Sequence, residues 1–158
     1  MQKNFYVAGL LAMCSFAANC PAQSAATQPD VNLTSLCALQ KQVVEGKHEM
    51  VRVAGIYGPS LDHTVLEEPS CSDEGTWVEL ELRSNQNKEK LRKILDHSRR
   101  AYVVVEGEFY GPPRPSPKLP ETIKQDYRPG WGHLAAFKTK LVVHIICDVN
   151  AAPTPTTH

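Results

Sequence analysis

The order of elements along residues 49–149 predicts a mainly β domain in which five strands close into a small Greek-key barrel. Three β-like runs come first, an amphipathic helix follows them, and two further β-like runs complete the order. Alternation of apolar and polar residues marks the strands, and apolar residues three and four positions apart mark the helix. This order is typical of a barrel with a helix between its third and fourth strands.

A short helix is expected before the first strand. Leu36, Leu39 and Val43 recur at helical spacing, Thr34 is placed to cap the first turn, and Gly46 is placed to end the helix. We interpret this helix as a plug for one end of the barrel.

The first three strands are expected over residues 49–57, 61–67 and 77–82, with a turn over residues 58–60 and a loop rich in turn-forming residues after the second strand. The third strand has the clearest alternation, which places its two faces on opposite sides of the sheet. Its inward residues are Val78, Leu80 and Leu82, and its outward residues are Trp77, Glu79 and Glu81.

The helix that follows is expected to begin at Asn85 or Asn87 and to end near Ser98. Its solvated side carries several basic residues, with Glu89 and Lys93 placed for an ion pair at spacing i,i+4. Its buried stripe is Leu91, Ile94, Leu95 and Ser98.

The fourth strand is expected over residues 101–110 and the last over residues 136–149. Inward residues of the fourth strand are Val103, Val105, Gly107 and Phe109. Between the two strands, residues 111–132 contain many prolines, which cannot take part in a strand ladder. We therefore predict a long extended loop, and loops of this length are often functional.

The N-terminus has the composition of a secretory signal peptide. Lys3 precedes an apolar run over residues 5–13, and small residues follow it. The run is too short to span a bilayer. We expect cleavage after Ser24 or Ala26 and a periplasmic or extracellular protein, with a lipid anchor at Cys20 as the alternative.

Four parts are expected along the chain. They are a signal peptide over residues 1–24, a flexible lead-in over residues 25–33, one domain over residues 34–149 and a disordered tail over residues 150–158. The 17 basic and 17 acidic side chains give no net charge. Nucleic-acid binders carry a basic surface, so the composition argues against a nucleic-acid partner.

Three of the five cysteines remain after the expected cleavage. In an oxidising compartment two of them are expected to pair. Cys37 is expected on the first helix and Cys71 in a loop, whereas Cys147 is in register with the inward residues Val143 and Ile145. We predict a Cys37–Cys71 disulfide, with Cys71–Cys147 as the alternative, and interpret Cys147 as a small buried apolar residue.

Several short motifs accompany this element order. They are Leu36-Cys37, Gly46-Lys47 before Val51-Arg52-Val53-Ala54-Gly55, Glu68-Pro69-Ser70-Cys71 before Trp77-Val78, and Gly132-His133-Leu134. Together with the element order, over residues 34–148, they resemble a group of small secreted bacterial proteins of the OB-fold whose role is undetermined. The resemblance implies export and an OB-fold, and it carries over no catalytic residue.

OB-folds bind ligands on the outer face of the second and third strands and on two of the connecting loops. The resemblance therefore implies a binding surface built from the third strand and the proline-rich loop. Candidate binding residues are Trp77, Glu79, Arg114, Tyr127, Arg128, Trp131 and His133. Aromatic rings and an arginine in one loop can stack on sugars, bases or prolines. The other interpretation is that Trp131 covers the barrel mouth and His133 is structural.

Residues with catalytic or metal-binding spacing are lacking. The histidines are scattered, and no Gly-x-Ser-x-Gly or phosphate-binding glycine motif occurs, so we expect no metal and no cofactor. The leading hypothesis is an exported, non-enzymatic binding module of the bacterial cell envelope whose partner is a protein or a glycan. The alternatives are a rigid structural or stress-related envelope protein without a small ligand, and a small hydrolase that uses His133.

Overall fold

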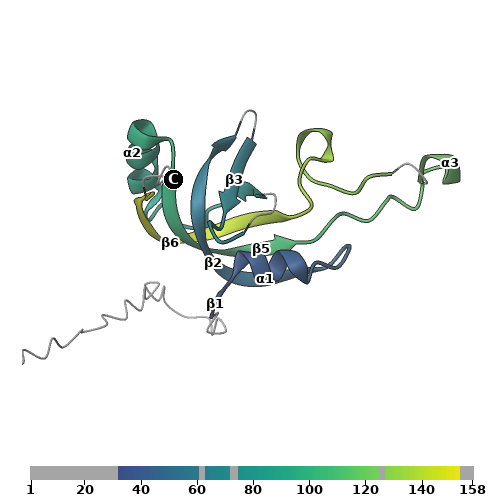
Figure 1. Ribbon diagram of the computed structural model, residues 1–158, viewed down its shortest axis with the longest axis horizontal. Coiled ribbons are helices and arrows are strands. Elements are labelled where there is room, and N and C mark those ends of the chain that lie inside the picture. Colours follow the sequence, from purple (N-terminus) through teal and green to yellow (C-terminus); the bar gives the residue numbers. More distant parts are fainter. Residues whose placement is uncertain (1–31, 61–62, 72–74, 125–126, 154–158) are drawn as a thin grey trace, which may run out of the picture.

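Figure 1 shows the computed structural model, which describes residues 32–60, 63–71, 75–124 and 127–153. Along the chain the elements are β1 (Leu33–Thr34), α1 (Leu36–Lys41), β2 (His48–Ser60), β3 (His63–Glu67), β4 (Thr76–Leu80), α2 (Lys88–Ser98), β5 (Ala101–Tyr110), α3 (Glu121–Lys124), the 3-10 helix η1 (His133–Ala135) and β6 (Lys140–Ala151). The expected signal peptide and Cys20 lie outside the described residues. No helix within these ranges is long and apolar enough to cross a bilayer.

Six strands form one mixed sheet, and five of them make a near-closed ring. The strand order is β1-β2-β3-β4-β6-β5, and β5 also pairs with β2. The β1–β2 and β4–β6 pairs are parallel, and the other pairs are antiparallel. The mainly β fold is therefore confirmed, and α2 lies between the third and fourth strands of the ring, as expected. The short edge strand β1 was not predicted.

The apolar core lies inside the ring. Its largest fully buried apolar side chains are Leu36, Leu66, Leu141, Val53, Val103, Val143 and Val149. Strand β5 has the predicted bounds, and its inward residues Val103, Val105 and Phe109 are all buried. Helix α1 contributes Leu36, and α2 contributes Leu91. Burial of side chains of this kind supplies roughly 1.5–3 kcal/mol each.

The predicted first helix exists, but its ends differ from the prediction. Ser35, not Thr34, is the N-cap, and its hydroxyl accepts a hydrogen bond from the amide of Ala38. The helix ends at Lys41, before Gly46, whose φ of 68° belongs to the following turn. The serine is a better cap here because it directly precedes the first helical residue.

Two expectations for the strands around β3 and β4 are wrong. Residues 58–60 are not a turn, because β2 continues through them and pairs Gly58 with Val65. Leu80 was expected in the core, yet it is 41 % exposed. It is the last residue of β4, so the ring no longer covers it. Leu82, beyond the strand, is partly buried against the core.

Strand β6 breaks the alternation that the sequence predicts. Its pairing with β5 shifts between Val104 and Val105 and again between Glu106 and Gly107. Each shift inserts one extra residue in β6, as in a β-bulge, and changes which side chains face inward. The inward residues after Val143 are therefore Ile146 and Val149, not Ile145 and Cys147.

Cys147 is nevertheless buried, as predicted. It is disulfide-bonded and is therefore not a free thiol. The interpretation of this cysteine as only a small apolar residue is thus corrected.

Helix α2 begins after Asn87, one of the two predicted caps. Asn87 has a φ of 63°, and its side chain makes no capping hydrogen bond. Leu91 is buried, and Ile94 and Leu95 pack against the core, but Ser98 is exposed and not part of the stripe.

The predicted ion pair on α2 is also different. Glu89 binds Arg92, with Nη2 and Oε1 2.7 Å apart, in place of Lys93. Arg92 also reaches Asp96 at 3.2 Å. The arginine can hold two carboxylates at once through its forked guanidinium.

The loop between β5 and β6, residues 111–139, is here called the arm. It extends away from the ring and carries α3 far from the sheet (Figure 1). Strand β6 starts at Lys140, later than the expected residue 136, because residues 131–137 form their own pairing. The backbone groups of Trp131 and Phe137 exchange hydrogen bonds of 2.7 and 3.2 Å.

Candidate ligand-binding surface

Four neighbouring strands place one side chain each in a row across the outer face of the ring. His48 on β2 is opposite Tyr110 on β5, Tyr110 is opposite Lys140 on β6, and Lys140 is opposite Trp77 on β4. Phe109, Leu141 and Val78, the chain neighbours of Tyr110, Lys140 and Trp77, belong to the core, so these three members of the row point outward. The rings of His48 and Tyr110 stack with centroids 5.2 Å apart.

Trp131 folds back from the arm onto this row. Its ring centroid lies 6.4 Å from that of Trp77 and 6.0 Å from that of Tyr110, which it meets edge to face. Its indole N–H donates to the carbonyl oxygen of Gly111 at 2.9 Å. The part of the arm that leads back to β6 is here called the returning limb. Trp131 therefore fixes the returning limb to the sheet.

The three aromatic rings surround the ammonium group of Lys140. The Nζ atom lies 4.2 Å from the ring centroid of Trp131, 5.0 Å from that of Tyr110 and 5.9 Å from that of Trp77. All three distances fall within the range of a cation–π interaction. We call Trp77, Tyr110 and Trp131 the aromatic cage. Glu79 completes the surroundings, with a carboxylate oxygen 3.2 Å from Nζ.

The carboxylate of Glu108 borders the cage. The Tyr110 hydroxyl donates a hydrogen bond to the carboxylate of Glu108. This bond lowers the pKa of Glu108, and it raises the pKa of Tyr110 to about 12. A hydrogen bond donated to a carboxylate stabilises the charged form of that carboxylate.

His144 is buried at the bulge of β6, on the far side of Glu108. Its Nδ1 atom donates to the backbone carbonyl oxygen of Glu81 at 3.3 Å. Its Nε2 atom lies 3.6 Å from Glu108 and has no hydrogen-bond partner among the described residues. The histidine is not part of the apolar core cluster and lies beside Glu108.

The structure brings together only some of the residues that the sequence nominated. Trp77, Glu79 and Trp131 meet around Lys140. Arg114 instead covers Gly46 and donates to the carbonyl oxygen of Glu45 at 3.3 Å.

Three other nominated residues are on the arm. Tyr127 is half-buried and Arg128 is exposed, and no recorded contact in the described ranges joins either to the cage. The side chain of His133 lies outside the described residues. Among the described residues, Tyr127 is therefore not part of the cluster that the two tryptophans form.

Sequence reasoning missed Lys140, Tyr110 and His48. Each has an outward position in a strand, but their proximity depends on which strands pair and in which register. The closed topology that the sequence suggested contains a parallel pairing of β4 with β6. That pairing would have placed Lys140 beside Trp77.

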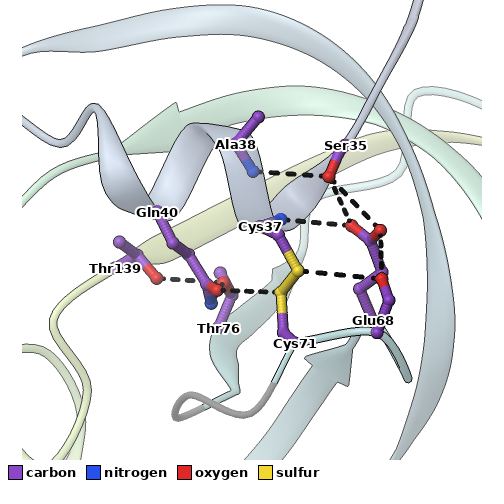
Figure 2. Close-up of a disulfide and its surroundings, with 9 residues drawn as sticks. Ser35, Cys37, Ala38, Gln40, Glu68, Cys71, Thr76 and Thr139 are labelled. Carbon is purple, nitrogen blue, oxygen red and sulfur yellow. Dashed lines mark hydrogen bonds between the residues drawn. A yellow bond between two sulfur atoms is a disulfide. The ribbon is translucent and has the colours of Figure 1, made fainter.

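The predicted Cys37–Cys71 disulfide is confirmed and joins α1 to the loop after β3 (Figure 2). Beside it, Glu68 accepts hydrogen bonds from the hydroxyls of Ser35 and Ser70 and from the amide of Cys37. Burial raises the pKa of Glu68, but the hydrogen bonds from Ser70, Cys37 and Ser35 outweigh it and lower that pKa. The carboxylate thus caps the positive end of α1.

Glu68 and the two sulfurs lie close enough together to hold a metal ion. Metal binding by cysteine requires the free thiolate, and here the sulfurs are bonded to each other. We therefore interpret this cluster as structural. A hydrogen bond of 3.0 Å from Gln40 to buried Thr76, and another of 2.9 Å between Thr76 and Thr139, further attach α1 to the sheet (Figure 2).

A cavity of about 240 Å³ lies between the end of α1, the start of β2 and Phe109. Its lining includes Val44, Lys47 and His48. The volume is below the 300–1,000 Å³ that ordinary small-molecule sites occupy. His48 connects this cavity to the row that carries the cage.

Comparisons with family models, with curated proteins and with solved structures give no match for this chain.

Proposed function

We propose that this protein is an exported, non-enzymatic binding domain with an OB-fold-like barrel, and that it binds its ligand on the outer face around the aromatic cage. The strand ring supports the fold assignment. Numbered from β2, its order is first, second, third, fifth, fourth and back to the first, with a helix between the third and fourth strands. That order and helix position are typical of the OB-fold.

The observation that carries the proposed function is the convergence of aromatic side chains on one outer face. Trp77, Tyr110 and Trp131 are each only partly buried, so each residue keeps some surface open to solvent. Trp77 stands on the third strand of the ring, and Trp131 stands on the loop between the fourth and fifth strands. These are the face and the loop through which OB-folds bind their ligands.

Chemistry at this surface favours binding over catalysis. Lys140 is paired with Glu79, and Glu108 is held by Tyr110. Tyr110 has a pKa of about 12 and therefore does not titrate near neutral pH. General acid–base catalysis needs a group whose pKa lies near the working pH.

Intrinsic fluorescence tests the proposal directly, because the chain has two tryptophans and both belong to the cage. Purified mature protein is titrated with envelope glycan fragments and with peptides that represent envelope proteins. We expect a saturable change in emission for one ligand class. Trp77→Ala and Trp131→Ala should each weaken that binding by about tenfold or more, since stacking on one ring contributes roughly 1–3 kcal/mol.

Tyr102→Ala is the matched control, because Tyr102 is a half-buried aromatic residue on the same strand as Tyr110 and belongs to no described cage contact. It should leave the affinity unchanged. If both tryptophan variants bind the identified ligand as tightly as the unmodified protein, the cage is not the binding surface. If no ligand in either class changes the emission, the rigid structural role becomes the better account.

A further inference from the structure

We propose that the ligand presents a positively charged amine or quaternary ammonium group, and that Lys140 occupies the place of this group when no ligand is bound. The inference depends on the proposed function, because it names the ligand chemistry of the same surface. The Nζ atom of Lys140 lies within 6 Å of three ring centroids. Cages of this kind recognise ammonium groups through the negative faces of the rings.

The charges around the cage also favour a cation. The outer face carries four glutamates in addition to Lys140: Glu79, Glu81, Glu106 and Glu108. Glu79 and Glu81 lie close enough to Tyr110 to raise its pKa, so both contribute negative potential at the cage. Of the basic groups on this face, Arg52 is already paired with Glu106, with Nε and Oε1 2.6 Å apart. An anionic ligand would meet an excess of carboxylates, whereas a cation would gain from them.

Lys140 is suited to give up its position. Its ammonium is on a flexible four-carbon stem and is held by one carboxylate, that of Glu79. Trp77 and Tyr110, in contrast, carry rigid rings on strands that pair with β6, and the Trp131 ring is anchored by its hydrogen bond to Gly111. If the stem turns outward, the rings and the carboxylate remain in place for another ammonium group.

This arrangement makes Lys140 an internal competitor. A cation from outside must displace a tethered group that is always present at a high effective concentration. Removal of the lysine should therefore strengthen the binding of external cations, whereas removal of any cage ring should weaken it. An ordinary surface lysine that only stabilises the fold would not have this effect.

The test uses tetramethylammonium chloride as the probe and tryptophan fluorescence as the readout, with sodium chloride at equal ionic strength as the reference. Lys140→Ala should bind tetramethylammonium at least about tenfold more tightly than the unmodified protein. Lys118→Ala, which removes an exposed lysine from the arm, should leave the affinity unchanged. A neutral alcohol with the same trimethyl shape, 3,3-dimethylbutan-1-ol, should bind Lys140→Ala several-fold more weakly than the cation does.

A second variant keeps the inference testable if loss of Lys140 loosens the arm. Glu79→Gln in the Lys140→Ala background retains the rings and removes the charge, and it should lower the tetramethylammonium affinity several-fold. Far-ultraviolet circular dichroism of each variant confirms that the sheet is retained. The inference is overturned if Lys140→Ala binds the cation no better than Lys118→Ala does, or if the neutral alcohol binds equally well. Saturable binding of a neutral glycan with no cation binding in Lys140→Ala would leave the proposed function standing and remove this inference alone.

Discussion

The indole rings of Trp77 and Trp131 lie 6.4 Å apart, centroid to centroid, and are inclined by 40°. One tryptophan comes from the third strand of the ring and the other from the returning limb of the arm. Their contact therefore helps to fasten the returning limb of the arm to the sheet. The arm is otherwise rich in proline and extends away from the ring (Figure 1).

Trp131→Ala should release the arm and destabilise the domain by about 1–3 kcal/mol, because it removes the hydrogen bond to Gly111 and the contacts with Lys140 and two rings. Urea unfolding followed by far-ultraviolet circular dichroism measures the loss. Ile123→Ala, at an exposed position on the arm, should change stability by less than about 0.5 kcal/mol. Equal losses in the two variants would show that Trp131 does not fasten the arm.

The disulfide should account for a large part of the stability of the domain. Cys37 and Cys71 are 34 positions apart in the sequence, and closing a loop of that length stabilises the native state by about 3–4 kcal/mol in the chain-entropy model. The Cys37→Ala/Cys71→Ala double variant should show this loss in urea unfolding under non-reducing conditions. A mass-spectrometric search for the cross-linked peptide gives an independent check. A peptide that links Cys71 to Cys147 would contradict the pairing.

Glu68 should make stability depend on pH. Its pKa is lower in the folded state than the value of about 4.3 for an unperturbed glutamate. The contribution is therefore fully present above the unfolded pKa, and it is lost as the pH falls through the folded pKa. At neutral pH, Glu68→Gln should cost about 0.5–2 kcal/mol, the range for loss of a helix cap.

The measurement is urea unfolding of both proteins from pH 2 to pH 7, and the gap between them should close toward the acid end. Glu67→Gln is the matched control. Its ion pair with Arg100 has side chains 48 % and 45 % exposed, and pairs of this kind contribute roughly 0–1 kcal/mol. A gap for Glu68→Gln that stays constant down to pH 2 would contradict the role of the charged carboxylate.

The predictability of the strands differs sharply between β5 and β6. The inward residues of β5 keep a constant spacing of two, and the strand and its buried residues Val103, Val105 and Phe109 follow the prediction. In β6 the two register shifts move the inward positions to Ile146 and Val149. A bulge depends on how two strands fit together, so the local alternation of one strand contains no sign of it.

The candidate site was predictable only in part, for a related reason. Trp77 and Trp131 were nominated because they are large aromatic residues on the third strand and in the long loop. Lys140 is what joins them, and its position beside Trp77 follows from a parallel pairing between strands distant in the sequence. Single-strand patterns give the face on which a residue lies, but the neighbours across that face require the register.

Gly107→Ala should be strongly destabilising because a methyl group at this position would overlap the carbonyl oxygen of Val142 in the neighbouring strand. The backbone of residue 107 fixes the position of the added Cβ atom, and the carbonyl oxygen is part of the Val142 backbone. Neither atom can rotate away. We expect a loss of about 1–3 kcal/mol or more, as for overpacked core positions. Gly75→Ala is the control, since its methyl group would meet the flexible side chain of Glu67 at 3.3 Å. Thermal unfolding of the two variants should separate them, and equal transition temperatures would contradict the close approach of β5 and β6.

Asn87, which precedes the first residue of α2, should stabilise the bulge of β6 at Cys147. Its amide nitrogen donates to the carbonyl oxygens of Ile146 at 2.8 Å and of Cys147 at 3.1 Å. These carbonyls lie where the ladder with β5 is interrupted, so the side chain replaces hydrogen bonds that the bulge has removed. Asn87→Asp exchanges the donor for a charged acceptor that faces two carbonyl oxygens, and it should cost about 2–3 kcal/mol in urea unfolding.

Asn87→Gly separates this effect from the backbone conformation. Glycine accepts the φ of 63° without strain but makes neither hydrogen bond, so we expect a loss of about 1–2 kcal/mol. Asn85→Asp, at an exposed position in the same turn, should be within about 0.5 kcal/mol of the unmodified protein. Amide hydrogen exchange in residues 145–149 should rise in both Asn87 variants and remain unchanged in Asn85→Asp. If Asn87→Gly keeps full stability and full protection of β6, the bulge is held by strand pairing alone.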